Sequence, residues 1–202
     1  MDHTEHAEHG RAGTSPAALT RDSNQTNDLD RVELVETTLA DRPIVENLAL
    51  FCAYDFSEFI PRDVGESGTF GGPGHGMLRG CWEDPRRHAF LIRAGGKLAG
   101  FAIVDDHSVP RGAGNRWEMG EFFILRRYRR QGVGERVARQ LFDRFRGRWV
   151  IYTFPQNAAA QVFWHTIIDR YAGGQFVADR WEGYGGLGYT WCFRSREPGG
   201  KS

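Results

Sequence analysis

The segment 117–171 constrains the fold more strongly than any other part of the chain. It begins with an aromatic, strand-forming run at 117–125, which a short basic turn joins to a helix whose apolar side chains recur at helical spacing over 133–145. A second strand follows at 149–154, and the clearest apolar stripe in the chain predicts a second helix at 157–171. This order predicts an α/β or mixed α+β fold around a single sheet.

The residues on either side of this segment supply further strands and one more helix. Residues 1–30 have almost no large apolar side chains and predict a disordered tail, so we expect one domain at 31–195 and a C-terminal tail at 196–202. Gly-rich stretches at 61–80 and 110–115 predict loops. The other predicted elements are a strand at 31–36, a helix at 41–59 with Asp41 as its cap and Pro43 in its first turn, a hairpin of strands at 88–94 and 97–104, and final strands at 175–181 and 188–194.

The composition argues against several classes of partner. The chain carries 26 Lys and Arg against 26 Asp and Glu, so its formal net charge is zero and gives no long-range attraction to nucleic acid or to an anionic membrane. No apolar run approaches the roughly 20 residues of a membrane span, and the polar N-terminus lacks the apolar segment of a signal peptide. We therefore expect a cytoplasmic protein. Three widely spaced cysteines predict reduced, mostly buried thiols, with neither a disulfide framework nor a metal site.

The turn before the helix at 133–145 predicts an anion site. Gly132 and Gly134 lack a Cβ atom, so a ligand can approach the backbone there. The first N–H groups of a helix have no internal partners and lie at the positive end of its dipole, which suits phosphates. Arg129 and Arg130 add positive charge at the same place. Val137 replaces the third glycine of a dinucleotide-binding fingerprint, and this turn does not end in the Gly-Lys-Ser/Thr of a P-loop, which leaves an ordinary turn with solvated arginines as the alternative.

Two motifs resemble those of one known family. Arg129-Arg130-Gln131-Gly132-Val133-Gly134 is similar to the Arg/Gln-x-x-Gly-x-Gly/Ala motif of the GNAT superfamily of N-acetyltransferases. Asn157-Ala158-Ala159-Ala160-Gln161-Val162-Phe163-Trp164 resembles the Asn-x-x-Ala-x-x-Phe-Tyr helix of that family, and the helix and strand between the motifs fit it as well. The resemblance covers about 31–195. It implies a GNAT-like acyl-CoA N-acyltransferase fold with acetyl-CoA as cosubstrate and no metal.

The resemblance also implies which residues hold the coenzyme. Backbone amides from Arg130 to Glu135 would bind the pyrophosphate. The end of the strand at 117–125 would pair with the pantetheine arm, and a backbone N–H there can polarise the thioester carbonyl. Asn157 would hydrogen-bond the same arm. The cofactor-binding residues implied in this way are Phe122, Phe123, Ile124, Arg129, Arg130, Gln131, Gly132, Val133, Gly134, Glu135 and Asn157.

A carboxylate near the end of that strand is the expected proton acceptor, because a primary amine is mostly protonated at pH 7 and must lose a proton before it attacks. Glu121 is the first choice, since it interrupts an aromatic run and, by the resemblance, stands where polyamine-acetylating members carry an acid. Glu118 is the second, and strand alternation predicts that the two lie on opposite faces of the sheet. For either residue, a solvated or salt-bridged carboxylate is the alternative. Trp164 replaces the tyrosine that many members place there, and an indole N–H cannot act as a general acid.

Three functions fit these residues. The first is direct, ternary-complex transfer of an acetyl group to a primary amine of a small molecule. The second is a coenzyme-A-binding sensor or interaction module with little catalysis, which Trp164 favours, and the third is acetylation of a protein or peptide amine. The polar residues at 54–58 and 105–107 fall where such folds line the acceptor side, although capping and surface exposure are the simpler explanation. A homodimer would follow family habit, and no nucleic acid or membrane partner is expected.

Overall fold

The computed structural model describes residues 31–61, 63–66, 68, 70, 78, 80–106, 116–183 and 186–195. The tails predicted at 1–30 and 196–202 lie outside the described residues. So do residues 71–77 of the first predicted loop, the second predicted loop at 110–115, and His107.

The strands of the described chain form one seven-stranded mixed sheet in the order β1-β2-β3-β4-β5-β7-β6. Neighbouring strands pair antiparallel except β4 and β5, which run parallel because a helix carries the chain back across the sheet between them. This arrangement confirms the predicted fold class. The elements are β1 (Val32–Glu36), η1 (Leu39–Asp41), α2 (Arg42–Phe56), β2 (Arg87–Ala94), β3 (Lys97–Asp106), β4 (Arg116–Ile124), η2 (Arg126–Tyr128), α4 (Val133–Arg144), β5 (Arg148–Thr153), α5 (Ala158–Ala172), β6 (Phe176–Gly183) and β7 (Gly186–Arg194).

Each predicted helix and strand is present, and the largest difference is at the first helix. α2 ends at Phe56 rather than at residue 59, and its first turn contains the predicted proline. Asp41 precedes α2 but does not cap it. Its carboxylate instead accepts hydrogen bonds from the backbone N–H and the hydroxyl of Thr38, both at 2.9 Å. These bonds form a capping box at the start of the short helix η1.

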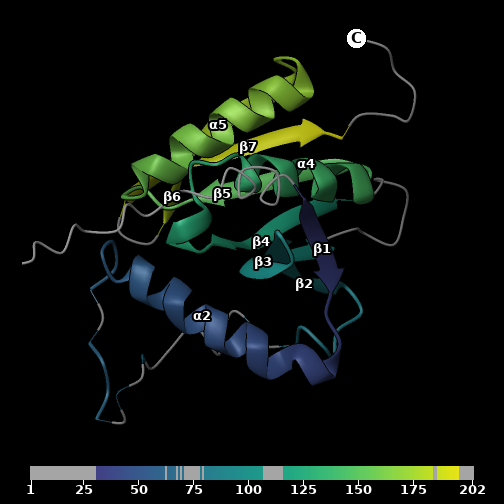
Figure 1. Cartoon of the computed structure of the whole chain (residues 1–202). Helices are drawn as coiled ribbons and strands as arrows, with labels where there is room; N and C mark the ends of the chain where they lie inside the picture. Colours follow the sequence, from purple (N-terminus) through teal and green to yellow (C-terminus); the bar gives the residue numbers. More distant parts are fainter. Residues whose placement is uncertain are drawn as a thin grey trace, which may run out of the picture.

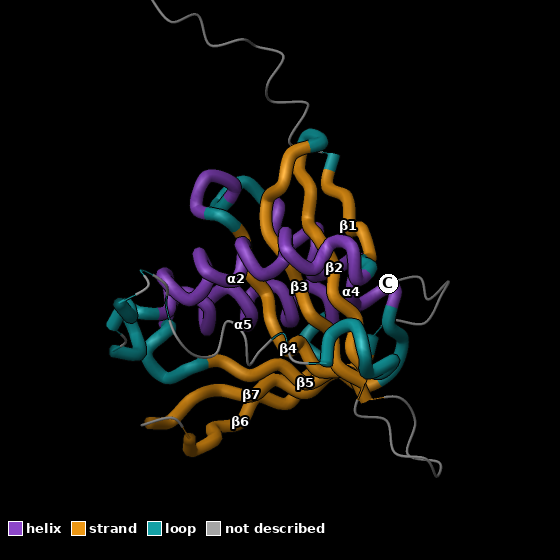
Figure 2. Tube along the Cα trace, turned by 90° about the horizontal axis from the view of Figure 1, so that it is seen from below, coloured by secondary structure: helices purple, strands orange, loops and turns teal. Residues whose placement is uncertain are grey.

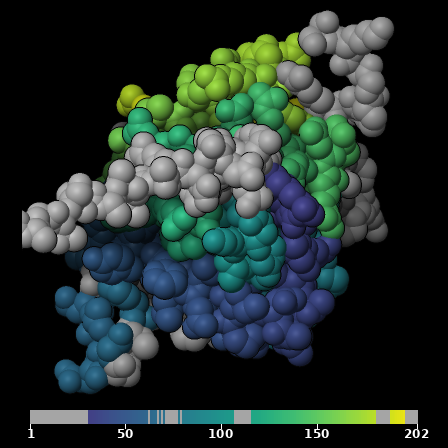
Figure 3. Space-filling view, viewed as in Figure 1, coloured from purple at the N-terminus to yellow at the C-terminus, as the bar shows by residue number. Residues whose placement is uncertain are grey.

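The helices lie on both faces of the sheet. α2 covers one face, and α4 and α5 cover the other (Figure 1). The core divides in the same way: one buried cluster joins α4 and α5 to the sheet, and a second joins α2 to β2, β3 and β4. The surface repeats the division, with α2 in blue below and α5 in yellow-green above (Figure 3). In β2, β3 and β4, the buried side chains therefore point either toward α2 or toward the α4–α5 layer.

The sheet opens between β4 and β5. These strands pair only over 116–118 and 148–150, and then separate. Figure 2 shows the consequence: β5, β7 and β6 run in a different direction from β1, β2 and β3. The opening lies beside the start of α4, so it brings the end of β4 and the basic turn to one place.

Candidate active site

The turn between β4 and α4 presents a run of backbone N–H groups. Arg130 and Gly132 both have positive φ, 59° and 76°, and only the glycine adopts this conformation without a penalty from Cβ. Among the described residues, no backbone N–H from Arg130 to Glu135 donates a hydrogen bond, and the next one, that of Arg136, donates to the carbonyl of Gly132 at 3.1 Å. Unpaired donors at the N-terminus of a helix favour an anion.

Gly134 has a packing role that the sequence did not indicate. A Cβ atom on this residue would lie 3.0 Å from two ring carbons of Phe163 and 3.7 Å from the ring of Phe122. Contacts of 3.0 Å force one of the partners to move. The start of α4 is therefore packed directly on α5 and β4, which fixes the position of the unpaired N–H groups.

The arginines of the turn differ in what they contact. Arg129 donates from Nε to the carbonyl of Ile124 at 2.7 Å and forms an ion pair with Asp55 of α2, while Arg126 binds the same carboxylate at 2.8 Å. Arg129 thus fastens the turn to α2, and Asp55 balances its charge. Arg130 is exposed and forms no ion pair with a described residue, so its charge is available to an incoming anion.

The remaining side chains of the turn are directed elsewhere in the protein. Val133 is fully buried in the core. Gln131 donates from Nε2 to the carbonyl of Arg127 at 2.5 Å. The carboxylate of Glu135 accepts hydrogen bonds from Arg139 at 3.2 Å and from Arg170 of α5 at 3.4 Å. These residues can therefore bind an anion through their main-chain N–H groups rather than through their side chains.

The residues predicted for the pantetheine arm lie along the open edge of β4. From Met119 onward, this strand has no pairing partner on its β5 side among the described strands. The rings of Phe122 and Phe123 pack on neighbouring aromatic side chains, and Ile124 is buried. The side chains belong to the core, whereas the backbone edge can pair with an extended ligand.

Asn157 lies at the start of α5 and its side chain has two uses. Its Oδ1 accepts a hydrogen bond from the N–H of Ala160 at 3.0 Å and so caps the helix. The Nδ2 group is a donor that the cap does not use. The sequence predicted a ligand contact here, and the structure adds the cap.

Trp164 is a core residue. It is 5% exposed and packs edge-on against Phe122 and Phe163, each with ring centroids 4.9 Å away. Tyr171, further along α5, is also buried and donates its hydroxyl proton to Asp143 at 2.8 Å. The sequence did not single out Tyr152, an exposed phenol on β5 two positions beyond the last residue that pairs with β4.

An extra residue in β4 changes the alternation of its side chains. The register against β3 pairs Glu121 with Ile103 and Met119 with Val104, so Gly120 is an unpaired residue that forms a β-bulge. A bulge moves every later side chain of the strand to the opposite face from the one that simple alternation predicts.

The predicted placement of Glu118 and Glu121 on opposite faces is therefore wrong. Both lie on the α2 face of the sheet, because their neighbours on either side of the bulge point toward α4 and α5. The prediction failed because strict alternation takes no account of an inserted residue. The neighbours that fix this orientation are Trp117, Met119, Phe122 and Ile124.

Glu121 has the environment of a group that exchanges protons near neutral pH. Burial raises the pKa of its carboxyl group to about 7, the positive charge of Arg87 opposes the rise, and the negative charge of Asp105 adds to it. No described residue donates a hydrogen bond or forms an ion pair with this carboxyl group. A carboxylate in this state can accept a proton from a ligand.

The sequence comparison identifies the family. Residues 54–166, more than half of the chain, match the family model described as the acetyltransferase (GNAT) family. The chain belongs to the GNAT acetyltransferase family. The matched segment runs from α2 into α5 and contains β4, the basic turn and α4. Membership supports acyltransferase activity for this GNAT protein. No curated protein matches the sequence.

Solved structures of acetyltransferases share the fold of this GNAT protein. An acetyltransferase from Thermus thermophilus aligns with a TM-score of 0.56 and 16% identity over 81% of this chain and 96% of the other. A spermidine N-acetyltransferase from Vibrio cholerae, in complex with CoA and spermine, aligns with a TM-score of 0.57 and 11% identity over 82% and 96%. At such identities the likeness is one of fold. None of the described helices is long and apolar enough to cross a membrane.

Proposed function

We propose that this GNAT protein is an N-acetyltransferase that transfers the acetyl group of acetyl-CoA directly to a primary amine of a small molecule, with Glu121 as the proton acceptor. The environment of Glu121 carries the proposal. Its carboxyl group has a pKa of about 7 and no partner among the described residues. It lies on the stretch of β4 that has separated from β5, next to the residues proposed for the thioester.

The residues near the sheet opening fit coenzyme A. The N–H groups from Arg130 to Glu135 suit its diphosphate, and Arg130 supplies an unbalanced positive charge. The open edge of β4 from Phe122 to Ile124 can pair with the amides of the pantetheine arm, as an added strand does. The Nδ2 group of Asn157 can donate to the same arm. The coenzyme supplies the acetyl thioester, and the protein supplies position and proton transfer.

The proton is handled by Glu121 and solvent. The Glu121 carboxylate accepts a proton from the amine nitrogen, whose lone pair then forms the C–N bond as the C–S bond breaks. A backbone N–H at the open edge of β4 polarises the carbonyl group. The leaving thiolate is stable enough to take its proton from water, so the mechanism needs no acid at Trp164. Since the ionised form of Glu121 is the active one, the rate should rise with pH through about 7.

A cationic small-molecule amine is the acceptor that the α2 face favours. Glu118 and Glu121 place carboxylates on this face in addition to the Arg87–Asp105 ion pair, and carboxylates attract a cationic ligand. The Vibrio cholerae structure named above contains spermine, which is an amine of this kind. This likeness supports the choice of acceptor class.

Glu121→Gln tests the proposal. The amide keeps the size of the side chain and cannot accept the proton, so kcat/KM for an amine found by screening should fall about 100-fold or more. Calorimetric affinity for coenzyme A should stay unchanged. Glu118→Gln is the matched comparison, because it removes from the same face and strand a carboxylate that attracts the amine without accepting its proton: KM should rise and kcat should stay unchanged. Turnover that survives in Glu121→Gln would remove this residue from the mechanism.

One observation favours a second function. Trp164 fills the core at the position where many family members have a tyrosine, which is compatible with a coenzyme-A-binding sensor that has little catalysis. The two functions differ in one assay: thiol release from acetyl-CoA against amines and peptides. Tight coenzyme binding with no transfer to any acceptor would favour the sensor, and transfer to peptides alone would favour a protein substrate.

A further inference from the structure

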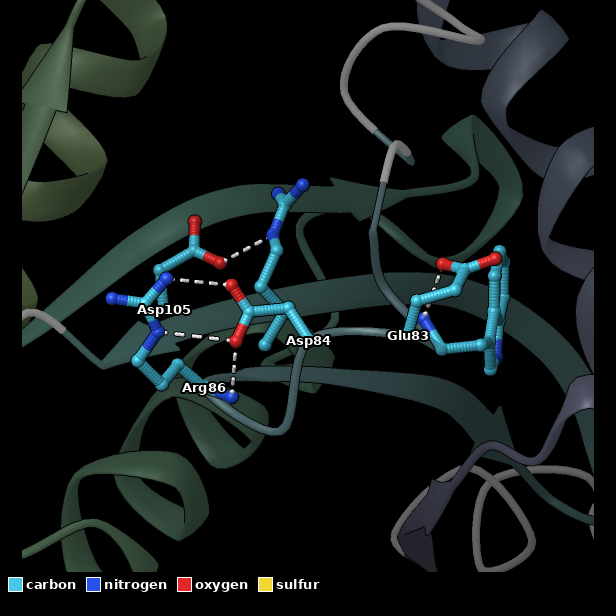
Figure 4. Close-up of polar contacts among 6 residues, drawn as sticks. Glu83, Asp84, Arg86 and Asp105 are labelled. Carbon is cyan, nitrogen blue, oxygen red and sulfur yellow. Dashed lines mark hydrogen bonds and ion pairs between the residues drawn. The ribbon is translucent and has the colours of Figure 1, made fainter.

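A charged row crosses three strands on the α2 face. Arg87 of β2 lies opposite Asp105 of β3, and Asp105 lies opposite Glu118 of β4. Arg87 Nε donates to Asp105 Oδ1 at 2.7 Å (Figure 4), and both side chains are mostly buried, 21% and 17% exposed. Ion pairs shielded from water in this way are screened less than surface pairs. Glu121 lies on the same face of β4, just after the bulge at Gly120.

Asp105 also lies against the bulge. A Cβ atom on Gly120 would be 2.3 Å from Asp105 Oδ2, so this carboxylate occupies the space that any other residue at position 120 would need. One oxygen of Asp105 is thus bound by Arg87, and the other lies over the residue that immediately precedes Glu121. The ion pair and the bulge form one packed unit.

The groups that act on Glu121 come from several elements. Arg87 and Asp105 contribute charges of opposite sign from β2 and β3. Cys52 of α2 and Cys81 also lie near it, and burial raises the pKa of both thiols, that of Cys81 to about 11, so that both are neutral at pH 7. Glu118 lies three residues earlier on the same strand. Among the described residues, Arg87 and Asp105 are therefore the charged groups that shift the pKa of the Glu121 carboxyl group.

We propose that Arg87 and Asp105 are positioning residues, a charge-balanced pair that holds Glu121 on the acceptor face in a state able to take a proton from the amine. This inference rests on the proposed function of Glu121. The cation stabilises the ionised carboxylate, and the anion stabilises the protonated form. The two charges act in opposite directions, so Glu121 can change its protonation state during turnover. Loss of either partner should shift the protonation equilibrium of Glu121 toward one form.

The two single substitutions should therefore move Glu121 in opposite directions. Arg87→Gln leaves Asp105 as the nearby charge, so the titration midpoint of Glu121 should move up by about one pH unit. Asp105→Asn removes the negative charge paired with Arg87, and the midpoint should move down by a similar amount. The double variant removes both charges and should titrate close to the wild type. Arg87→Lys keeps the charge and should restore most of the wild-type midpoint.

Direct titration of Glu121 tests the inference. The carboxyl ¹³C signals of protein labelled with ¹³C-glutamate are followed by NMR over pH, and the signal absent from Glu121→Gln identifies Glu121. Circular dichroism checks that each variant is folded, and Arg87→Lys with Asp105→Asn provides the comparison if Arg87→Gln unfolds. Opposite shifts that cancel in the double variant support the pair. Midpoint shifts in the same direction, or no shifts, overturn the inference. A purely structural role of Arg87 and Asp105 does not predict that the two substitutions shift the Glu121 midpoint in opposite directions.

The pH dependence of turnover separates this inference from the proposed function. If Glu121 is the proton acceptor, the acid limb of kcat/KM should follow the NMR midpoints in each variant. NMR midpoints that shift while the acid limb stays in place would uphold the ion pair and contradict the role of Glu121 in catalysis. An acid limb that shifts without a change in the NMR midpoints would contradict the inference.

Discussion

The two sides of the candidate site are built from different chemical groups. On the proposed coenzyme side, the available donors are main-chain N–H groups from Arg130 to Glu135, and most of the side chains there contact other parts of the protein. On the proposed acceptor side, side chains would carry the chemistry, namely Glu121 with Arg87 and Asp105 around it. A main-chain donor is present whatever residue carries it, whereas one substitution removes a carboxylate. The coenzyme side should fail when conformation or packing changes, and the acceptor side when a single side chain changes.

Gly134→Val should break the coenzyme side with the largest effect. Its Cβ would begin 3.0 Å from the Phe163 ring, and the added methyl groups increase the overlap. We expect a loss of about 1–3 kcal/mol in the free energy of unfolding, measured by thermal unfolding, and a fall of about 30-fold in calorimetric affinity for coenzyme A. Gln131→Ala is the control, because it alters a side chain of the same turn and keeps the N–H group. Equal losses in both variants would mean that side chains hold the coenzyme.

Gly120→Ala should disturb the packing of the acceptor side, because it adds a single methyl group where the Asp105 carboxylate lies. The new Cβ would lie 2.3 Å from Asp105 Oδ2, and the backbone of Gly120 needs no positive φ, so the carboxylate is the main obstacle. We expect a loss of about 1–2 kcal/mol in the free energy of unfolding. In an Asp105→Ala background the same change should cost little, and a double-mutant cycle measures the difference. A cost that is independent of residue 105 would show that the bulge itself excludes a side chain.

The fold was predictable because its signals are local and repeated. The apolar stripe of α5 and the alternation of the hairpin β2–β3 each follow from the periodicity of one segment. Gly132 by itself indicates a backbone with positive φ. The coenzyme side shares this property, since N–H groups at a helix start require little beyond the helix and the glycine.

The acceptor side was harder to predict because its contacts join distant segments. Arg87 meets Asp105 across 18 positions, and Arg129 meets Asp55 across 74. The bulge at Gly120 cannot be recognised from the periodicity of a nine-residue strand, yet it places Glu121 on the same face of the sheet as Glu118. The sequence identified the carboxylates and could not supply their partners, because partners depend on register.

The pH dependence of stability offers a smaller test of the acceptor side. Burial raises the pKa of Glu121 from 4.5 to about 7, so between these values the folded protein keeps a proton that the unfolded chain releases. The free energy of unfolding should therefore fall as pH rises from about 4.5 to 7, and level off above. Since Glu121 is partly exposed, we expect Glu121→Gln to gain about 1 kcal/mol at pH 8, or about 2–4 °C in Tm, and nothing at pH 4.5. Equal Tm differences between the variant and the wild type at both pH values would contradict a raised pKa of Glu121 in the folded protein.

Arg129 and Arg130 of the turn allow the finest comparison, since the sequence motif predicts the same role for both. Arg130 is exposed and unpaired among the described residues, so Arg130→Gln should weaken coenzyme A binding about threefold and reduce the dependence of affinity on salt. Asp55 balances Arg129, which also donates to Ile124, so Arg129→Gln should keep the wild-type salt dependence and lower Tm by about 1–3 °C. Calorimetry at two salt concentrations, with thermal unfolding, measures both. A weakened salt dependence in Arg129→Gln would mean that its charge acts on the coenzyme rather than joining the two sides of the site.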